Sequence, residues 1–153
     1  MTEFSQVNPN TIPLELLLEA DPDTRAVENY LQDSICFVAH LHNKIIAACI
    51  VKPTCTTSAE IFNVSVFPEY QKMGIGSELL HYVIKTLSAT NITRLELGTG
   101  TFGHQLTYYQ RAGFRVDSVI KNHFLDSYDQ PIWENGIQHK DMLRLYLDLP
   151  PND

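Results

Sequence analysis

A glycine-rich loop between a strand-like segment and an amphipathic helix is the feature that most limits how this chain can fold. Residues 59–67, AEIFNVSVF, are rich in the β-branched and aromatic residues that favour strands. The loop QKMGIGS follows at residues 71–77. The helix predicted next has its apolar side chains on one face, at Ile75, Leu79, Leu80, Val83, Ile84 and Leu87. A strand joined to a one-sided helix in this way predicts a sheet with helices packed on it.

The other segments supply further strands and helices. Strands are predicted at residues 3–7, on both sides of a turn centred on Asn43, and in ITRLELG, FRVDSVI and DMLRLYLDL. Two helices are predicted within residues 10–31 and a short one within GHQLTYYQRAG. Between residues 121 and 140 the pattern is weak, although the Asn-Gly pair at 135–136 indicates a turn. The mixture predicts an α/β or α+β sheet domain.

Composition excludes several classes of protein. The net charge of −7 argues against a nucleic-acid-binding protein, because such a protein presents a basic surface. The longest apolar run covers residues 45–51, far below the roughly 18 residues that span a bilayer. Three cysteines are too few, and odd in number, for a disulfide framework. We therefore expect a single cytoplasmic domain over residues 1–153, with no membrane or nucleic-acid partner.

A second glycine stretch, GTGTFG at residues 98–103, matches the G-x-G-x-x-G pattern of dinucleotide-binding folds. Such folds place this pattern in the first strand-to-helix turn of a long parallel sheet. Here it lies about two-thirds along the chain, with too little sequence left for the second half of that fold. We therefore interpret these glycines as shaping a turn, and an NADH-binding oxidoreductase is the less favoured alternative.

The loop QKMGIGS is better suited to an anion. A helix N-terminus carries a partial positive charge and several unpaired N–H groups, which together form an anion-binding site. Gly74 and Gly76 allow a close approach to the backbone because they have no Cβ, and Lys72 adds a full positive charge.

The residues around this loop resemble the central motif of the GNAT superfamily of N-acetyltransferases. That motif runs from a strand end through a tyrosine to Q/R-x-x-G-x-G/A, and its residues here are Val66, Pro68, Tyr70, Gln71, Gly74 and Gly76. YYQRAGF is similar to a second element of the family, through Tyr109, Gly113 and Phe114. The resemblance implies a mixed, twisted, mostly antiparallel sheet of about six to seven strands flanked by helices. It also implies an acetyl-CoA-dependent N-acetyltransferase that needs no metal.

The resemblance further implies which residues hold the cosubstrate. Backbone N–H groups would cradle the pyrophosphate along Gln71, Lys72, Met73, Gly74, Ile75, Gly76 and Ser77. The main chain of Val64, Ser65 and Val66 would bind the pantetheine arm as an added strand would. One departure is Phe102, which stands where many members of the family have an asparagine.

Catalytic roles are expected at two residues. Tyr109 stands where the family has its general-acid tyrosine, and Tyr108 is expected to face elsewhere, beside Gln105. Glu60 lies six residues before Val66, a spacing at which some members carry a glutamate, and it is the candidate base. The alternatives for the base are Glu96 and a chain of water molecules.

Other chemistry-bearing residues are given structural roles. His40 and His42 are expected to form a hairpin pair without metal, because no third ligand is evident. The three cysteines, Cys36, Cys49 and Cys55, are expected in the core.

The sequence leaves the acceptor open between small-molecule and peptide amines. A cationic acceptor is suggested by the net charge and by Asp126, Asp129 and Glu134 in a segment that either lines the acceptor pocket or packs as a loop. A homodimer is one possible state. The rival from another class is a non-catalytic acyl-CoA-binding sensor on the same fold.

Overall fold

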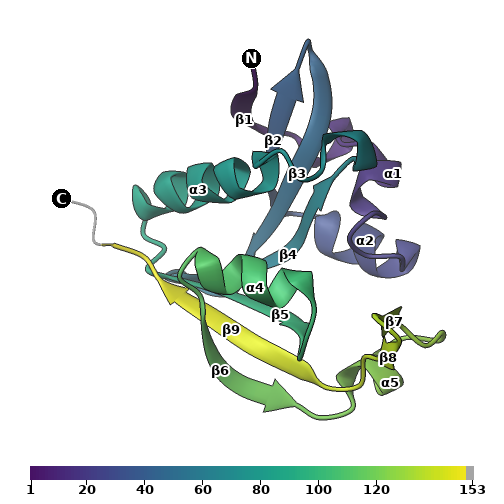
Figure 1. Ribbon diagram of the computed structural model, residues 1–153. Coiled ribbons are helices and arrows are strands. Elements are labelled where there is room, and N and C mark those ends of the chain that lie inside the picture. Colours follow the sequence, from purple (N-terminus) through teal and green to yellow (C-terminus); the bar gives the residue numbers. More distant parts are fainter. Residues whose placement is uncertain (151–153) are drawn as a thin grey trace.

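A seven-stranded sheet runs through the computed structural model, which describes residues 1–150 (Figure 1). Its strands, in spatial order, are β1 (Glu3–Val7), β2 (Ile35–Leu41), β3 (Lys44–Pro53), β4 (Ser58–Val66), β5 (Arg94–Gly100), β9 (Met142–Asp148) and β6 (Arg115–Ile120). Neighbouring strands are antiparallel except β4 and β5, which are parallel. The predicted fold class is therefore confirmed.

Helices cover both faces of the sheet. One face packs on α1 (Leu14–Leu17) and α2 (Thr24–Leu31), and the other on α3 (Ile75–Ser88) and α4 (His104–Arg111). Strand β2 serves both layers, since Cys36 and Val38 contact the α1–α2 layer while Phe37 and Ala39 contact the α3 layer. This explains why β2 and β3 are apolar without alternation, as strands buried on both faces are.

The turn predicted at Asn43 is confirmed, with His42 and Asn43 both at positive φ (51° and 63°). His42 therefore belongs to the turn and His40 to β2. Cys36 and Cys49 are buried as expected, but Cys55 is exposed. The prediction for Cys55 was wrong because the apolar run ends at β3 and residues 54–57 form a surface turn. No helix within residues 1–150 is long and apolar enough to cross a membrane.

The segment of weak pattern folds into short elements. Helix α5 (His123–Ser127) is followed by a two-stranded hairpin of β7 (Trp133–Glu134) and β8 (Ile137–Gln138). The Asn135–Gly136 turn has positive φ at both residues, 53° and 77°, as the sequence indicates. Helix α5 was not predicted, because five residues are too few to show helical periodicity.

Strands β4 and β5 separate soon after they pair. Their parallel ladder joins only residues 58–60 to residues 94–96. Beyond Glu60, β4 stays paired with β3 while β5 stays paired with β9. Figure 1 shows the two strands diverging beneath α4. Residues 61–66 of β4 therefore have no neighbouring strand on the β5 side.

The glycines of the GTGTFG stretch leave space for side chains from residues 134–142. A Cβ on Gly98, Gly100 or Gly103 would collide with Met142, His139 or Glu134, respectively. Because β5 is antiparallel to β9 here, the stretch is not part of a dinucleotide-binding unit. These glycines instead let the segment after α5 lie close against β5 and the start of α4.

We predict that Gly100→Ala destabilises the fold. The added Cβ would enter the ring of His139, which is buried and stacked on Phe102 with ring centroids 4.1 Å apart. Overpacking of this kind costs about 1–3 kcal/mol. Thermal unfolding should show a melting temperature lower by about 2–4 °C per kcal/mol.

Gly76→Ala is the matched control for that change. Its Cβ would meet atoms no closer than 3.6 Å, and alanine favours a helix more than glycine does. Its melting temperature should equal or exceed that of the wild type. A Gly100→Ala protein as stable as the wild type would contradict the packing described for His139.

Candidate active site

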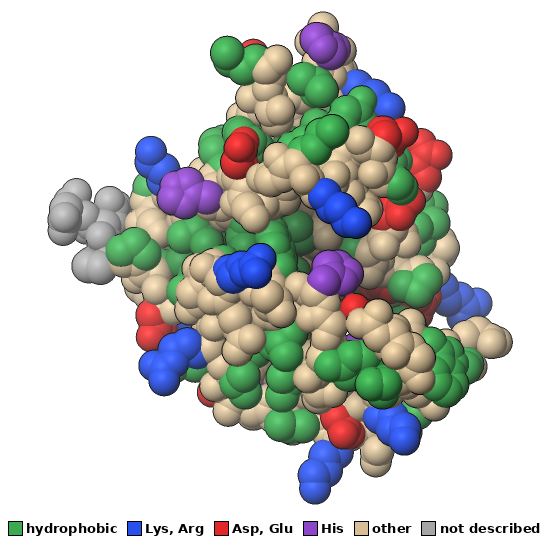
Figure 2. Space-filling view, viewed as in Figure 1, with side chains coloured by type: hydrophobic (Ala, Val, Ile, Leu, Met, Phe, Trp, Pro, Cys, Tyr) green, Lys and Arg blue, Asp and Glu red, His purple; other side chains and the backbone are tan. Residues whose placement is uncertain are grey.

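Two pockets open into the gap between β4 and β5. The first, here the α3 pocket, has a volume of about 710 Å³. It is lined by Glu19, Ala20, His104, Gln105, Tyr108, Tyr109 and residues 64–66, 70–72 and 74–77. The second, here the α5 pocket, has a volume of about 410 Å³ and lies between the start of α2, β4, β5, β9 and α5. On the face shown in Figure 2, Lys or Arg side chains stand beside a hollow with hydrophobic side chains at its base.

The α3 pocket ends at the N-terminus of helix α3. Gly74 is the N-cap in the left-handed conformation, with φ of 80°, and provides no side chain to cap the helix. The first intrahelical bond is donated by the Glu78 N–H to the Gly74 carbonyl. The preceding N–H groups are therefore not used by the helix and can bind an anion. Lys72, also at positive φ (64°), lines the same pocket.

All but one of the residues predicted to bind the cosubstrate line the α3 pocket. Val64, Ser65, Val66, Gln71, Lys72, Gly74, Ile75, Gly76 and Ser77 all line the α3 pocket. Met73 is not among its lining residues, and 65% of its surface is exposed. The side chain of Met73 therefore lies on the surface beside the pocket. Phe102 lines neither pocket and stacks on His139.

Tyr109 forms part of the wall between the two pockets. It lines both of them, together with Ala20, Val64 and Gln105. The ring is buried and packs edge-on against Tyr108 and Phe114, at centroid distances of 5.0 and 5.7 Å. Burial raises the pKa of the Tyr109 phenol well above its usual value, so the group is protonated at neutral pH. It is therefore available as a proton donor.

Tyr108 is also at the site, contrary to the expectation that it faces elsewhere. Its hydroxyl donates to the Gly76 carbonyl at 2.7 Å, and its ring lines the α3 pocket. Adjacent helical residues do point about 100° apart. Both nevertheless face the gap, because α4 lies over the place where β4 and β5 have separated.

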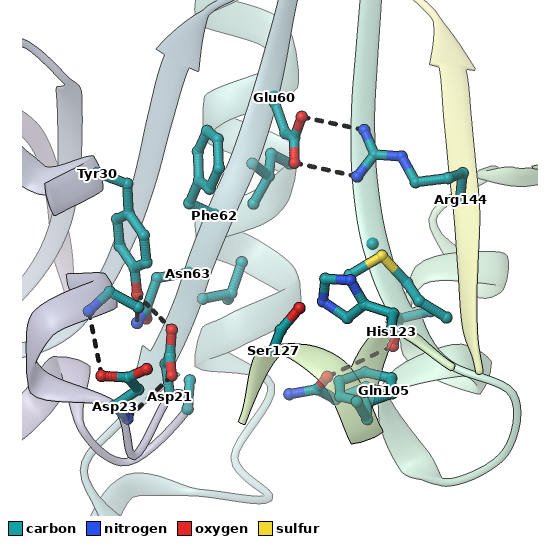
Figure 3. A pocket seen from close by; sticks show the side chains of 18 of the residues that line it. Asp21, Asp23, Tyr30, Glu60, Phe62, Asn63, Gln105, His123, Ser127 and Arg144 are labelled. Carbon is teal, nitrogen blue, oxygen red and sulfur yellow. Dashed lines mark hydrogen bonds and ion pairs between the residues drawn. The ribbon is translucent and has the colours of Figure 1, made fainter. Parts of the chain in front are cut away.

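Glu60 lines the α5 pocket in an ion pair that the sequence did not reveal. Its two carboxylate oxygens accept from Arg144 of β9, at 3.0 and 3.1 Å (Figure 3). The pair spans β5 at Gly98, which lies opposite Arg144 in the strand register and has no side chain in the way. Hydrogen bonding to Glu60 raises the pKa of Arg144. Arg144 could not be predicted, because its reach depends on a register between distant strands.

Glu96, the alternative base, lies elsewhere. It is directly beside Glu60 in the parallel register, but it pairs with Arg94 at 3.7 Å and lines neither pocket. Within residues 1–150 no group of three or more His, Cys, Asp or Glu could hold a metal ion.

A buried polar network also reaches the α5 pocket. The Tyr30 hydroxyl donates to Asp21 at 3.2 Å and accepts from the Asn63 amide at 2.9 Å. Asn63 donates as well to the Leu17 carbonyl at 2.9 Å, and Ser65 donates to Asn63 at 2.7 Å. The sequence alone does not indicate Asp21, Tyr30 and Asn63, because a lone polar residue in a strand or helix gives no signal of its partners.

The segment of weak pattern contributes to the α5 pocket in part. His123, Phe124, Ser127 and Tyr128 line it, whereas Trp133 does not. The acidic residues expected there, Asp126, Asp129 and Glu134, are not among its lining residues either. Glu134 instead accepts from His139 at 2.9 Å. The acidic side chains that do line the pocket are Asp21, Asp23 and Glu60.

Comparisons with known proteins identify the family of the chain. The family model for the acetyltransferase (GNAT) domain matches residues 32–116. The uncharacterized N-acetyltransferase YvbK of Bacillus subtilis strain 168 is 38% identical over 136 residues, covering 88% of each chain.

Two solved structures resemble the whole fold. A GNAT family acetyltransferase from Elizabethkingia anophelis, with acetyl-CoA bound, is 37% identical with a TM-score of 0.91, covering 97% of this chain and 98% of the other. A Bacillus subtilis acetyltransferase in complex with CoA is 35% identical with a TM-score of 0.86 and the same coverage. The predicted family and the predicted acetyl-CoA cosubstrate are thus confirmed, and the chain belongs to the GNAT family of acetyl-CoA-dependent N-acetyltransferases.

Proposed function

We propose that this enzyme transfers the acetyl group directly from acetyl-CoA in the α3 pocket to a primary amine in the α5 pocket. The observation that carries the proposal is that Tyr109 and Val64 line both pockets. A thioester at the end of one pocket can therefore meet an amine at the end of the other. We further propose that residues 1–153 act as a single domain.

The cosubstrate is proposed to lie along β4 and the start of α3. Its pyrophosphate would accept hydrogen bonds from backbone N–H groups of residues 71–77, including Met73 through its main chain. Its pantetheine arm would follow residues 64–66, which have no neighbouring strand on that side. Two similar acetyltransferases have acetyl-CoA or CoA bound, which supports coenzyme A as the ligand of such a site.

The reaction requires two protons to leave nitrogen. An ammonium acceptor first loses one proton to a base, and the free amine then attacks the thioester carbonyl. The C–N bond forms, the C–S bond breaks, and Tyr109 donates its proton to the departing sulfur. The second proton from nitrogen restores the Tyr109 phenol. The products are the neutral amide, CoA thiol and one proton released to solvent.

Glu60 is proposed as the base, acting through water. Both of its oxygens already accept from Arg144. A carboxylate offers about four lone-pair sites, so a water molecule can still donate to it. Glu60 also lies four residues before Val64 on β4, about 13 Å along a strand, which is too far for direct contact with an amine beside Val64.

An amine panel tests the function. Purified enzyme, acetyl-CoA and one primary amine are mixed, and free thiol is followed with dithionitrobenzoate. The panel covers small cationic amines, neutral amines and peptide N-termini. Thiol release that depends on an amine is expected, together with recovery of the acetylated amine. If none of the amines in a broad panel causes thiol release, the result would instead favour the non-catalytic sensor.

We predict that Gly74→Glu abolishes acetyl-CoA binding. The new side chain would place a negative charge at the proposed pyrophosphate site, although nothing lies within 4 Å of a Cβ there. Gly136→Glu is the matched control, because Gly136 has a similar φ (77° against 80°), equally open surroundings and a position outside the α3 pocket. Calorimetry should show wild-type affinity only for the Gly136 variant. Equal affinities would refute the placement of the pyrophosphate.

We predict that Tyr109→Phe lowers kcat by about 10²-fold or more, because it removes the proposed proton donor. Its acetyl-CoA affinity should be nearly unchanged. Tyr108→Phe is the neighbouring control. It should affect a different quantity, because it loses the hydrogen bond to the Gly76 carbonyl at the start of α3. We expect it to weaken acetyl-CoA binding and largely spare kcat. If Tyr108→Phe proved to be the variant with the low kcat, the assignment of the acid would move to Tyr108.

We predict that Glu60→Gln lowers kcat at neutral pH by about 10²–10⁴-fold, the usual size of general-base catalysis. Much of the loss should return at high pH, where the free amine is abundant. Glu96→Gln is the control, because Glu96 is the register neighbour of Glu60 but lines neither pocket. A loss for Glu60→Gln that stays constant up to about pH 10, near the pKa of an alkylamine, would indicate that the ion pair with Arg144 is structural only.

A further inference from the structure

The side chains that line the α5 pocket carry more negative than positive charge. Five charged or titratable groups other than tyrosine line it: Asp21, Asp23, Glu60, His123 and Arg144. Glu60 and Arg144 neutralise each other. Burial lowers the pKa of His123, with Arg144 adding to the effect, so His123 is neutral at neutral pH. Within residues 1–150, Asp21 and Asp23 form no salt bridge.

Asp21 is the less well compensated of the two carboxylates. One oxygen accepts from the Asp23 N–H at 3.1 Å and the other from the Tyr30 hydroxyl at 3.2 Å. These neutral donors do not cancel the charge of a half-buried carboxylate, and burial raises the pKa of Asp21. The nearby groups are Asp23 and the phenols of Tyr30 and Tyr128, none of which supplies positive charge.

Asp21 is also close to where the pockets meet. It follows Ala20, which lines both pockets. Asp23 already has a structural task, because its side chain accepts from the N–H groups of Arg25 and Ala26 and caps α2. Figure 3 shows Asp21 near the end of the pocket where Gln105 lies, away from the Glu60–Arg144 pair.

The position of Asp21 is fixed from β4. Tyr30, which donates to Asp21, is itself held by the amide of Asn63, a residue that is only 4% exposed. The ring of Tyr30 stacks on Phe62 at 5.2 Å between centroids. Strand β4, which is proposed to end beside the thioester, therefore also positions this carboxylate, although the two lie far apart in sequence.

We propose that Asp21 binds the ammonium group of the acceptor and so selects cationic amines; this rests on the proposed function of the α5 pocket. A cation is the ligand that would compensate a half-buried, unpaired carboxylate. Acetylation converts the ammonium into a neutral amide, so the same contact favours the substrate over the product. Asp21 thus determines specificity, while proton removal is left to the water chain and Glu60.

Paired acceptors test the proposal. The amine 2-phenylethylamine is charged at neutral pH, whereas its 2,2-difluoro derivative is mostly uncharged because fluorine lowers the pKa of the amine. In Asp21→Asn we expect KM for the charged amine to rise about tenfold or more, the size expected for a lost hydrogen bond between charged groups. KM for the fluorinated amine should change little, and kcat for both should stay within a few-fold.

Asp23→Asn is the matched control. Asparagine caps a helix as well as aspartate does, so this change removes a nearby charge and keeps the cap. It should raise KM for the charged amine less than Asp21→Asn does. An equal rise for both amines in Asp21→Asn, or no rise, would overturn the proposal. If the wild type acetylates neither these amines nor any of the broader panel, the proposed function fails first.

Folding of the Asp21 variant is checked by its acetyl-CoA affinity, because Asp21 does not line the α3 pocket. If the variant does not fold, the wild type supplies the test. In the complex with CoA, where no transfer can occur, 2-phenylethylammonium should shift the carbon NMR resonance of the Asp21 carboxylate and lower its pKa. A resonance unmoved at saturating amine would overturn the proposal.

Discussion

The separation of β4 from β5 is the constraint on which the site depends. Their ladder stops after three residues of β4, and the remaining six continue with only one neighbour. Main-chain groups that a sheet would use are thereby left for an extended ligand. Helix α4 lies over the same gap, and both Tyr108 and Tyr109 line the α3 pocket. A continuous β4–β5 ladder would leave no space for either pocket.

The Glu60–Arg144 pair lies where the two strands begin to separate. It links β4 to β9 across β5, which lacks a side chain at Gly98. Breaking a partly buried pair of this kind leaves an uncompensated charge, which is strongly destabilising in the interior. The residue proposed to relay the proton therefore also helps to define the geometry of the gap. This is why a loss of activity in a Glu60 variant is informative only with its pH dependence.

Burial raises the pKa of both titratable groups at the junction, but their ordinary pKa values differ, so they take opposite roles. The Tyr109 phenol is held protonated and can donate, while Asp21 keeps a poorly compensated carboxylate. A cationic acceptor would relieve that charge and become neutral on acetylation. A few buried groups can thus account for acceptor binding, proton delivery and product release. In this proposal the acceptor itself supplies the positive charge that Asp21 lacks.

The sequence by itself determined most of the local elements, with α5 as an exception, and the proposed cosubstrate loop. The stripe from Ile75 to Leu87 and the glycines before it carry their information in consecutive residues, so the helix and its open N-terminus could be predicted. Arg144, Asp21 and the meeting of the pockets at Tyr109 were decided only by the tertiary structure. Arg144 reaches Glu60 through the register of β5 and β9, and Asp21 is fixed through Tyr30 and Asn63. Such contacts depend on strand order and packing, which no local pattern of residues encodes.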